Sequence, residues 1–273
     1  MNLYEMRIDR FNFDTSENYD KYNSFSIGHE SCIIKFFKII QNTKFISFLQ
    51  DQKDKGKDIR ILTPFIPQNY LNTMKMTLNN LFKKSLFSES IIIINDLGML
   101  HYIHQLYPHR KFCLGRNLIF SFDFTPWGEL IYANETSQIQ QIIKQVNLLD
   151  NTKIIFFKKY NVTSLESNIT PNTFCSLKQL NSLGLDVYIN ESFFLYGIQR
   201  SCYIRRNSPD NQCDYKKCDM CQKITLTNQW EECNFFLNET VKYFPSVLLL
   251  RGNQICGQAR FHNEHQFNRI ISE

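Results

Sequence analysis

The chain has 273 residues, of which 43% are hydrophobic and 21% charged, a composition typical of globular proteins that excludes a disordered or fibrous chain. Its formal charge of +5 comes from 31 basic and 26 acidic residues scattered along the sequence, which gives no case for nucleic-acid binding. No apolar run approaches the roughly 20 residues of a membrane span, and the N-terminus has no signal-peptide core. A cytoplasmic protein is therefore expected.

Apolar strand patterns alternate with amphipathic helix patterns through the first 200 residues. Residues 59–65 and 91–96 are β-branched runs typical of buried parallel strands, and residues 69–87 between them have the apolar spacing of a helix with one buried face. Further along, the sequence predicts helices over 97–107, 137–149 and 174–184 and strands over 111–115, 153–158 and 185–190. This alternation predicts an α/β fold, either a barrel or a doubly wound sheet, and no GxGxxG motif supports the second.

The pattern changes after residue 200. A cysteine-rich stretch is followed by two predicted strands within residues 246–261, joined by a turn at Gly252 and Asn253. This region is too short to form a core of its own. We therefore expect a barrel over residues 1–200, and over residues 201–273 a cysteine-rich loop and β-hairpin extension packed on it.

Four of the nine cysteines, Cys202, Cys213, Cys218 and Cys221, fall within RSCYIRRNSPDNQCDYKKCDMCQ at residues 200–222. Where thiols stay reduced, clustered cysteines indicate metal or redox chemistry more often than disulfides. Only one CxxC pair is present, which does not match a zinc ribbon, and the spacing does not match the ferredoxin runs either. The stretch by itself leaves a metal site and uncoordinated thiols both open.

The other cysteines have a different context. Cys113, Cys175 and Cys256 lie in apolar stretches and are predicted to be small core residues. Cys32 stands alone at the start of an apolar, helix-like run, and its local sequence also predicts a core position.

Four segments, taken in order from residue 24 to residue 261, carry a resemblance to a known family. SIGHESC (26–32) resembles a strand ending in a G-E-x-x-C turn, and INDLGML (94–100) resembles an N-D-hydrophobic-G/A signature. CYIRR (202–206) resembles a C-F-T-A-R segment with cysteines downstream, and LLLRGNQICGQAR (248–260) resembles an L-N-G-x-Q strand. These are features of the collagenase-like, unassigned-type peptidase family, in its UbiU/UbiV-like iron–sulfur branch and most of all its UbiV-like members.

The resemblance implies a TIM-like (β/α) barrel that carries an iron–sulfur cluster. A 4Fe-4S cluster is implied, with zinc as the alternative metal, and its implied ligands are Cys32, Cys202, Cys213 and Cys218, with Cys221 as the alternative to Cys218. A barrel brings the C-terminal ends of distant strands together, so an early cysteine can meet a late loop there. Because only some two dozen residues precede the G-E-x-x-C turn, the barrel is expected to be incomplete or irregular at its N-terminus.

The implied activity is oxygen-independent hydroxylation of a small aromatic or nucleobase substrate, the latter in RNA. Asn95 and Asp96, at the end of a predicted strand, are the candidate catalytic residues, and Arg206 and Arg116 are the candidate substrate-binding residues. A helix cap at Asp96 and a surface position for Arg206 fit the sequence equally well.

Two other functions stay open. One is a non-catalytic iron–sulfur subunit that forms a heterodimer with a UbiU-like homologue. The other is a peptidase, for which the sequence contains neither HExxH nor GxSxG.

Overall fold

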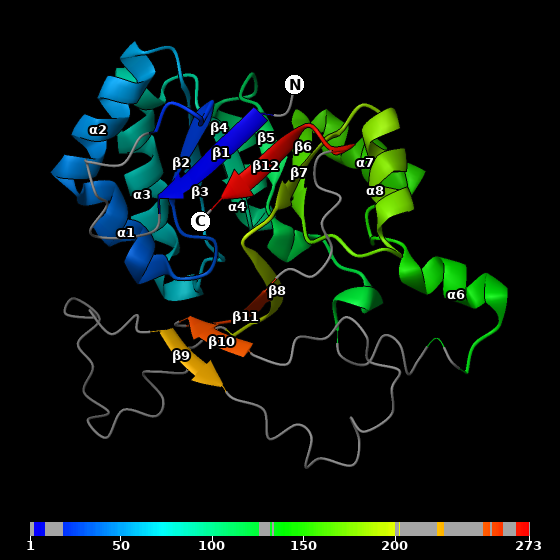
Figure 1. Ribbon diagram of the computed structural model, residues 1–273. Helices are drawn as coiled ribbons and strands as arrows, with labels where there is room; N and C mark the ends of the chain where they lie inside the picture. The colour runs from blue at the N-terminus through cyan, green and yellow to red at the C-terminus, as the bar shows by residue number, and fades with distance from the viewer. Residues whose placement is uncertain are drawn as a thin grey trace.

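The strands of the described residues form a closed barrel of eight parallel strands and a separate antiparallel sheet of four (Figure 1). The barrel confirms the predicted α/β, TIM-like architecture. The computed structural model describes residues 3–8, 19–125, 132, 134–199, 202, 223–226, 248–251, 253–258 and 266–272.

The barrel strands follow one another in chain order around the ring, and the strands of the small sheet come between the seventh and the last of them in the sequence. They are β1 (Leu3–Ile8), β2 (Ser24–Gly28), β3 (Asp58–Leu62), β4 (Ile91–Ile94), β5 (Phe112–Leu114), β6 (Val162–Ser167), β7 (Asp186–Asn190) and β12 (Arg269–Ser272). The C-terminal strand β12 inserts between β7 and β1 and pairs in parallel with both. The expected incompleteness at the N-terminus is thus wrong, because β1 supplies the first strand and the two ends of the chain close the ring together.

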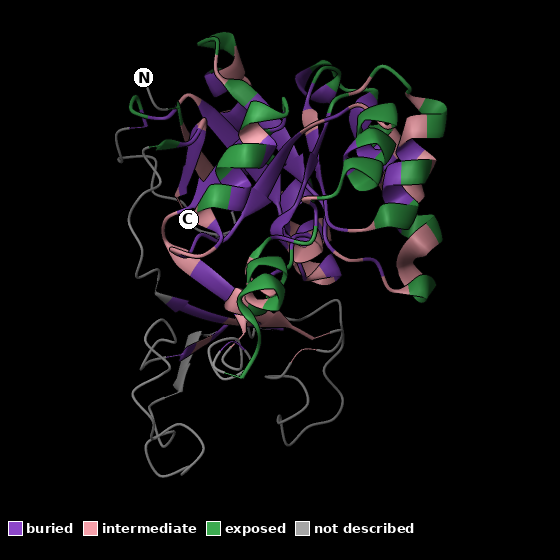
Figure 2. Cartoon of the chain, turned by 90° about the vertical axis from the view of Figure 1, so that its right-hand side faces the viewer, coloured by how far each residue is buried: buried purple, intermediate pink, exposed green. Residues whose placement is uncertain are grey.

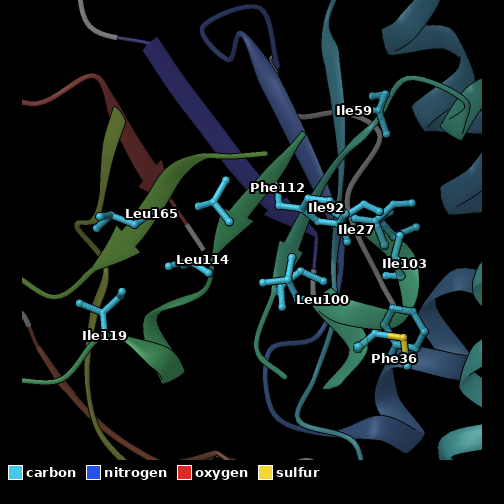
Figure 3. Packing of buried hydrophobic residues seen from close by; sticks show 14 of the residues in the cluster. Ile27, Phe36, Ile59, Ile92, Leu100, Ile103, Phe112, Leu114, Ile119 and Leu165 are labelled. Carbon is cyan, nitrogen blue, oxygen red and sulfur yellow. The ribbon is translucent and has the colours of Figure 1, made fainter. Parts of the chain in front are cut away.

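Amphipathic helices cover the outside of the barrel. They are α1 (Ile33–Gln41), α2 (Thr43–Asp54), α3 (Leu71–Phe82), α4 (Leu97–Leu106), α7 (Asn151–Lys159) and α8 (Phe174–Ser182). A further helix, α6 (Ser137–Lys144), has no buried residue and lies away from the barrel strands (Figure 1). Figure 2 shows buried residues on the strands and exposed residues on the outer faces of the helices. Phe36 of α1 and Leu100 of α4 lie close to Ile27 and Ile92 of the strands, in the apolar layer between strands and helices (Figure 3). Burial of this layer supplies the main hydrophobic stabilisation of the fold.

One predicted strand is a helix. Residues 153–158 were expected to form a strand, but they lie within α7, whose N-cap Asp150 accepts a hydrogen bond from the Lys153 amide at 3.1 Å. Ile154 and Phe157, three residues apart, face the core, and the strand itself follows as β6. A short apolar run fits a buried helix face and a buried strand equally well, which explains the error.

Several other predicted elements are confirmed. The strands expected over 91–96, 111–115 and 185–190 are β4, β5 and β7. The helix expected over 137–149 is the shorter α6, which ends at Lys144.

The antiparallel sheet lies at the end of the barrel toward which β1 and β12 point in Figure 1. It consists of β8 (Phe193–Ile198), β9 (Lys223–Leu226), β10 (Leu248–Arg251) and β11 (Gln254–Gln258), in the order β8-β11-β10-β9. The predicted hairpin is β10 and β11. The division differs from the expected boundary at residue 200, because β8 precedes that boundary and belongs to the small sheet, whereas β12 follows it and belongs to the barrel.

The barrel interior is lined in large part by charged side chains. Glu5 of β1 lies 3.3 Å from an Arg60 guanidinium nitrogen and 3.4 Å from one of Arg269, and all three side chains are buried. Arg60 also donates a hydrogen bond to the Tyr188 hydroxyl at 3.3 Å. Burial alone would raise the pKa of Glu5, but Arg60, Arg269 and Arg7 together lower it below its ordinary value. The carboxylate is therefore ionised at neutral pH and balances arginines from three strands.

Substitution of Gly28, the last residue of β2, tests how closely β2 packs against β3 in the barrel. Its φ is +129°, and a Cβ atom there would lie 2.1 Å from the Leu62 carbonyl oxygen. We predict that Gly28→Ala lowers the free energy of unfolding by about 3 kcal/mol or more, measured by denaturant titration. Gly197→Ala is the control, because its Cβ would meet no atom within 4 Å, and its effect should stay within about 0.5 kcal/mol. Equal stability of the two variants would contradict the close approach of β2 to β3.

Candidate functional site

A cavity of about 680 Å³ opens at the C-terminal ends of the barrel strands, beneath the antiparallel sheet. Its described walls come from the segments that follow β2, β3, β4, β5 and β6 and from β8 and the β10–β11 turn. This is the end of the barrel where enzymes with this architecture carry their sites. Cys32, Cys202, Asn95 and Arg116, which sequence reasoning selected, all line it.

Two of the expected cluster ligands therefore line one cavity. Cys32 is the N-cap residue of α1, directly after β2, and Cys202 follows β8, and both are partly buried. The other expected ligands, Cys213, Cys218 and Cys221, lie outside the described residues, as does Arg206. Within the described part of the chain, no group of three or more His, Cys, Asp or Glu side chains is placed to hold a metal ion.

The turn that carries Cys32 is fixed by local hydrogen bonds. The His29 Nδ1 atom accepts hydrogen bonds from the Ser31 amide at 3.2 Å and the Cys32 amide at 3.0 Å. The Ser31 hydroxyl donates to Asn253 Oδ1 at 2.7 Å, and Asn253 Nδ2 donates back to the Ser31 carbonyl oxygen at 3.0 Å. The β10–β11 turn is thereby joined to the cysteine-bearing turn by a pair of buried hydrogen bonds.

Glu30 is the centre of a buried ion-pair cluster in the same turn. Arg116 binds both carboxylate oxygens, with Nη2 at 2.6 Å and Nε at 2.8 Å, and Arg7 Nη1 lies 3.2 Å away. The side-chain amide of Gln254 also donates a hydrogen bond to Glu30 Oε1. Arg7 also binds Glu166 inside the barrel, where the Arg7 Nη2 atom lies 2.7 Å from each of the two Glu166 carboxylate oxygens. Elements from both ends of the sequence thus converge on one carboxylate.

The buried carboxylates and guanidinium groups of this cluster compensate one another's charge, but each loses its hydration by being buried, which costs free energy of folding. Burial raises the pKa of Glu166, and the neighbouring Arg7 opposes the rise without cancelling it. Buried ion pairs of this kind add little net stability, but removal of one partner leaves a charge without compensation. The cluster therefore fixes the geometry of the turn more than it stabilises the fold.

Arg116 lines the cavity but is committed to these partners. Besides its bidentate pair with Glu30, its Nη1 donates to the Phe193 carbonyl oxygen at 2.7 Å. The expected role in substrate binding would require a guanidinium group directed at the cavity, and this one joins the barrel to the small sheet.

Asn95 also lines the cavity while joining neighbouring strand ends. Its Nδ2 donates to the Thr63 carbonyl oxygen at 2.8 Å, and its Oδ1 accepts a hydrogen bond from the backbone amide of Asn117 at 3.3 Å. A Cβ atom at Gly115 would lie 2.1 Å from that Oδ1, so only glycine fits beside it. The Asn95 side chain therefore connects the ends of β3, β4 and β5.

Asp96 is a helix cap. Its Oδ1 accepts a hydrogen bond from the Met99 amide at 3.0 Å, and its Oδ2 accepts one from the Ile66 amide at 3.4 Å. It is not among the described residues that line the cavity. The geometry matches the capping alternative that the sequence left open beside a catalytic role.

The remaining described cysteines divide between core and surface. Cys113 and Cys256 are fully buried, as predicted, and burial raises the pKa of the Cys113 thiol, which keeps it protonated. The prediction for Cys175 is wrong, because it is exposed on α8, whose buried face is formed by Ser176, Leu177 and Leu180. Cys175 therefore serves as a surface control for the cavity cysteines.

Sequence reasoning missed the polar residues that hold the site together. Glu30 lies in SIGHESC (26–32) and Gln254 in LLLRGNQICGQAR (248–260), two of the segments that carry the resemblance, but neither was selected as a site residue. Asn117 and Gln199 line the cavity and lie in no such segment, and Asn253 was predicted only as a turn residue. Glu5 and Arg7, spaced by two and hence on one face of the first strand, are a sequence signal for the charged barrel interior; no comparable signal marks Glu30.

Comparison of the chain with protein-family models, with curated proteins and with solved structures finds no match. Within the part of the chain that the structure describes, no helix has the length and apolar character to cross a membrane.

Glu30 provides the test of the site's architecture. We predict that Glu30→Gln lowers the free energy of unfolding by about 3 kcal/mol, because Arg7 and Arg116 then lose the charge that compensates them. Glu135→Gln is the matched control on the surface, with an expected effect within about 0.5 kcal/mol. If thermal and denaturant unfolding show the same small effect for both variants, Glu30 does not hold the cluster together.

Proposed function

We propose that the protein is a UbiV-like iron–sulfur protein that takes part in oxygen-independent hydroxylation of an aromatic or nucleobase substrate. Its 4Fe-4S cluster would be held by Cys32, Cys202, Cys213 and Cys218, with Cys221 as the alternative to Cys218. The observation that carries this proposal is that Cys32 and Cys202, far apart in the sequence, line the same cavity at the C-terminal end of the barrel.

The chemistry of the described donors fits such a group. Thiolates are soft ligands that bind iron–sulfur clusters and zinc, so zinc remains the alternative metal. Cys32 lies at the N-terminus of α1, where the helix dipole favours a negatively charged ligand. A bound cluster would supply electron transfer or activation of an oxygen-bearing substrate.

The cavity walls suit a planar, apolar substrate. Phe65, Tyr70, Phe120, Phe124 and Tyr196 contribute aromatic rings, and aliphatic side chains fill much of the remaining described lining. Such walls bind rings by apolar contact and exclude water from the space beside Cys32 and Cys202. Binding and orientation of the substrate are thus the tasks of this chain's own residues.

The peptidase alternative gains no support from these walls. The described lining residues include no Asp, Glu or His, and so provide no general base for hydrolysis. The Ser31 hydroxyl lies 3.3 Å from His29 Nδ1, but it donates its proton to Asn253 Oδ1 at 2.7 Å, and the same histidine nitrogen already accepts the Ser31 and Cys32 backbone amides.

A second candidate is a non-catalytic iron–sulfur subunit that pairs with a UbiU-like homologue. The observation that favours it is that Asn95 joins strand ends and Asp96 caps a helix, so both expected catalytic residues have structural partners. Co-purification of a homologous chain from the native host, with activity only in the complex, would support this candidate over a self-sufficient enzyme.

Replacement of Cys32 tests the proposed ligation. We predict that Cys32→Ser, purified without oxygen, loses most of its iron and its absorbance near ~400 nm, because a hydroxyl replaces a thiolate ligand. Cys175→Ser should keep the full iron content, since that cysteine is exposed on α8 away from the cavity. Full iron content in Cys32→Ser would remove Cys32 from the ligand set.

A further inference from the structure

One asparagine side chain joins the two segments that carry the cavity cysteines. We propose, resting on the proposed function of this same cavity, that Asn253 is a positioning residue of the metal site. It holds the segment of Cys32 and the segment of Cys202 at the separation that a shared metal centre requires. Asn253 belongs to neither segment, because it lies in the β10–β11 turn of the small sheet.

The contacts of Asn253 with the first segment involve Ser31, the residue directly before Cys32. The Asn253 Nδ2 atom donates a hydrogen bond to the Ser31 carbonyl oxygen at 3.0 Å, and Oδ1 accepts one from the Ser31 hydroxyl at 2.7 Å. Both residues are buried, which strengthens these bonds relative to bonds exposed to water. The backbone and the side chain of Ser31 are thus both held by one residue of the small sheet.

The contacts with the second segment involve Gln199, which lies three residues before Cys202. The same Nδ2 atom donates to the Gln199 carbonyl oxygen at 2.9 Å, and the Gln199 backbone amide donates to the Asn253 carbonyl oxygen at 2.9 Å. Three residues of chain span at most about 11 Å, so Cys202 stays within that distance of the anchored Gln199. One amide group therefore restrains both cysteine-bearing segments.

The chemistry of an amide suits this task. The two carbonyl oxygens can only accept hydrogen bonds, so each takes one of the two hydrogens on Nδ2, and Oδ1 is left to accept from the Ser31 hydroxyl. Residues that hold metal ligands in place without touching the metal typically contribute about 10- to 100-fold to metal affinity. Through the same contacts, a metal bound to both cysteines would stabilise the docked position of the small sheet.

Asn168 provides a matched control. It is a second buried asparagine that joins the barrel to the small sheet, because its Nδ2 donates to the Leu195 carbonyl oxygen at 2.7 Å and its Oδ1 accepts from the Leu195 amide at 3.1 Å. Leu195 lies in the middle of β8, and neither bond reaches the segment of Cys32. An aspartate at either position keeps the shape and an acceptor oxygen but loses the donor hydrogens.

The first experiment measures the binding of Co²⁺ to metal-free wild-type protein, Asn253→Asp and Asn168→Asp, each shown to be folded by circular dichroism and kept without oxygen. Binding is followed by the thiolate-to-cobalt charge-transfer absorption. Asn253→Asp should weaken Co²⁺ binding about tenfold or more and Asn168→Asp by less than about threefold, because only Asn253 holds both ligand segments. Equal losses of Co²⁺ affinity in the two variants, or no loss in Asn253→Asp, overturn the proposal.

The wild-type protein alone gives a second test, which stands even if a variant fails to fold. Co²⁺ bound to both cysteines should slow hydrogen exchange of the Gln199 amide at least about threefold, measured by mass spectrometry, because Asn253 links that amide to both segments. The Lys57 amide, hydrogen-bonded to the Gln52 carbonyl oxygen in the loop before β3, is the reference that should not change. An unchanged exchange rate at Gln199 overturns the proposal.

Iron content of the wild-type protein separates this inference from the proposed function. Iron-loaded wild-type protein whose Asn253→Asp variant keeps full metal affinity overturns the positioning role alone. Iron-free wild-type protein that binds Co²⁺ with the expected dependence on Asn253 supports the positioning role and overturns the cluster. Wild-type protein that holds neither iron nor Co²⁺ overturns both.

Discussion

The site depends on one buried carboxylate, that of Glu30. It accepts hydrogen bonds from Arg7 of β1, from Arg116 in the segment after β5 and from Gln254 of β11. Glu30 lies two residues before Cys32 in the sequence. Desolvation offsets much of the Coulombic gain of such pairs, so their effect is to select one arrangement rather than to stabilise the fold strongly. Because the partners come from both ends of the chain, the turn reaches this geometry only when the barrel is closed and the small sheet is docked.

The barrel interior follows from the same constraint. In β1 and β12, the strands that close the ring, alternate side chains point outward to the helices and inward to the barrel interior. Glu5, Arg7 and Arg269 point inward, where Glu5 pairs with Arg60 and Arg269 and Arg7 pairs with Glu166. Several interior polar atoms, among them Glu5 Oε1 and the Arg60 Nε, have no hydrogen-bond partner. The interior therefore combines these ion pairs with an apolar cluster of Leu62, Ile93, Cys113, Tyr188 and Ile271. Arg7 links the ion pairs to Glu30, which directly precedes the cavity-lining Ser31.

The sequence predicted the repeating part of this structure and little of the polar network. β-branched runs such as 91–94 identify buried strands because every residue there is isoleucine, and the hairpin after residue 246 has a clear turn. Periodicity could not distinguish a helix from a strand for 153–158, since six residues complete less than two helical turns. The closing strand β12 is only four residues long, so its role depends on β1 and β7, which are distant in sequence.

The candidate site was predicted in the same uneven way. Cys202 was selected from a cluster of four cysteines, whereas Cys32 was predicted locally to be a core residue and became a candidate only through the family resemblance; both line the cavity. Asparagines and glutamines are common, and nothing in the local sequence separates Asn117 or Gln199 from the many that lie on surfaces. Asn95 and Asp96 were placed correctly at a strand end, but their hydrogen bonds to Thr63 and Met99 depend on tertiary and capping geometry.

The claim that Cys32 and Cys202 belong to one metal site is tested most directly by the metal content of the wild-type protein. Purified without oxygen, it should be brown, absorb near ~400 nm and contain about four iron and four acid-labile sulfide per chain. A colourless protein with one bound zinc, or with no metal, would contradict an iron–sulfur centre in this cavity.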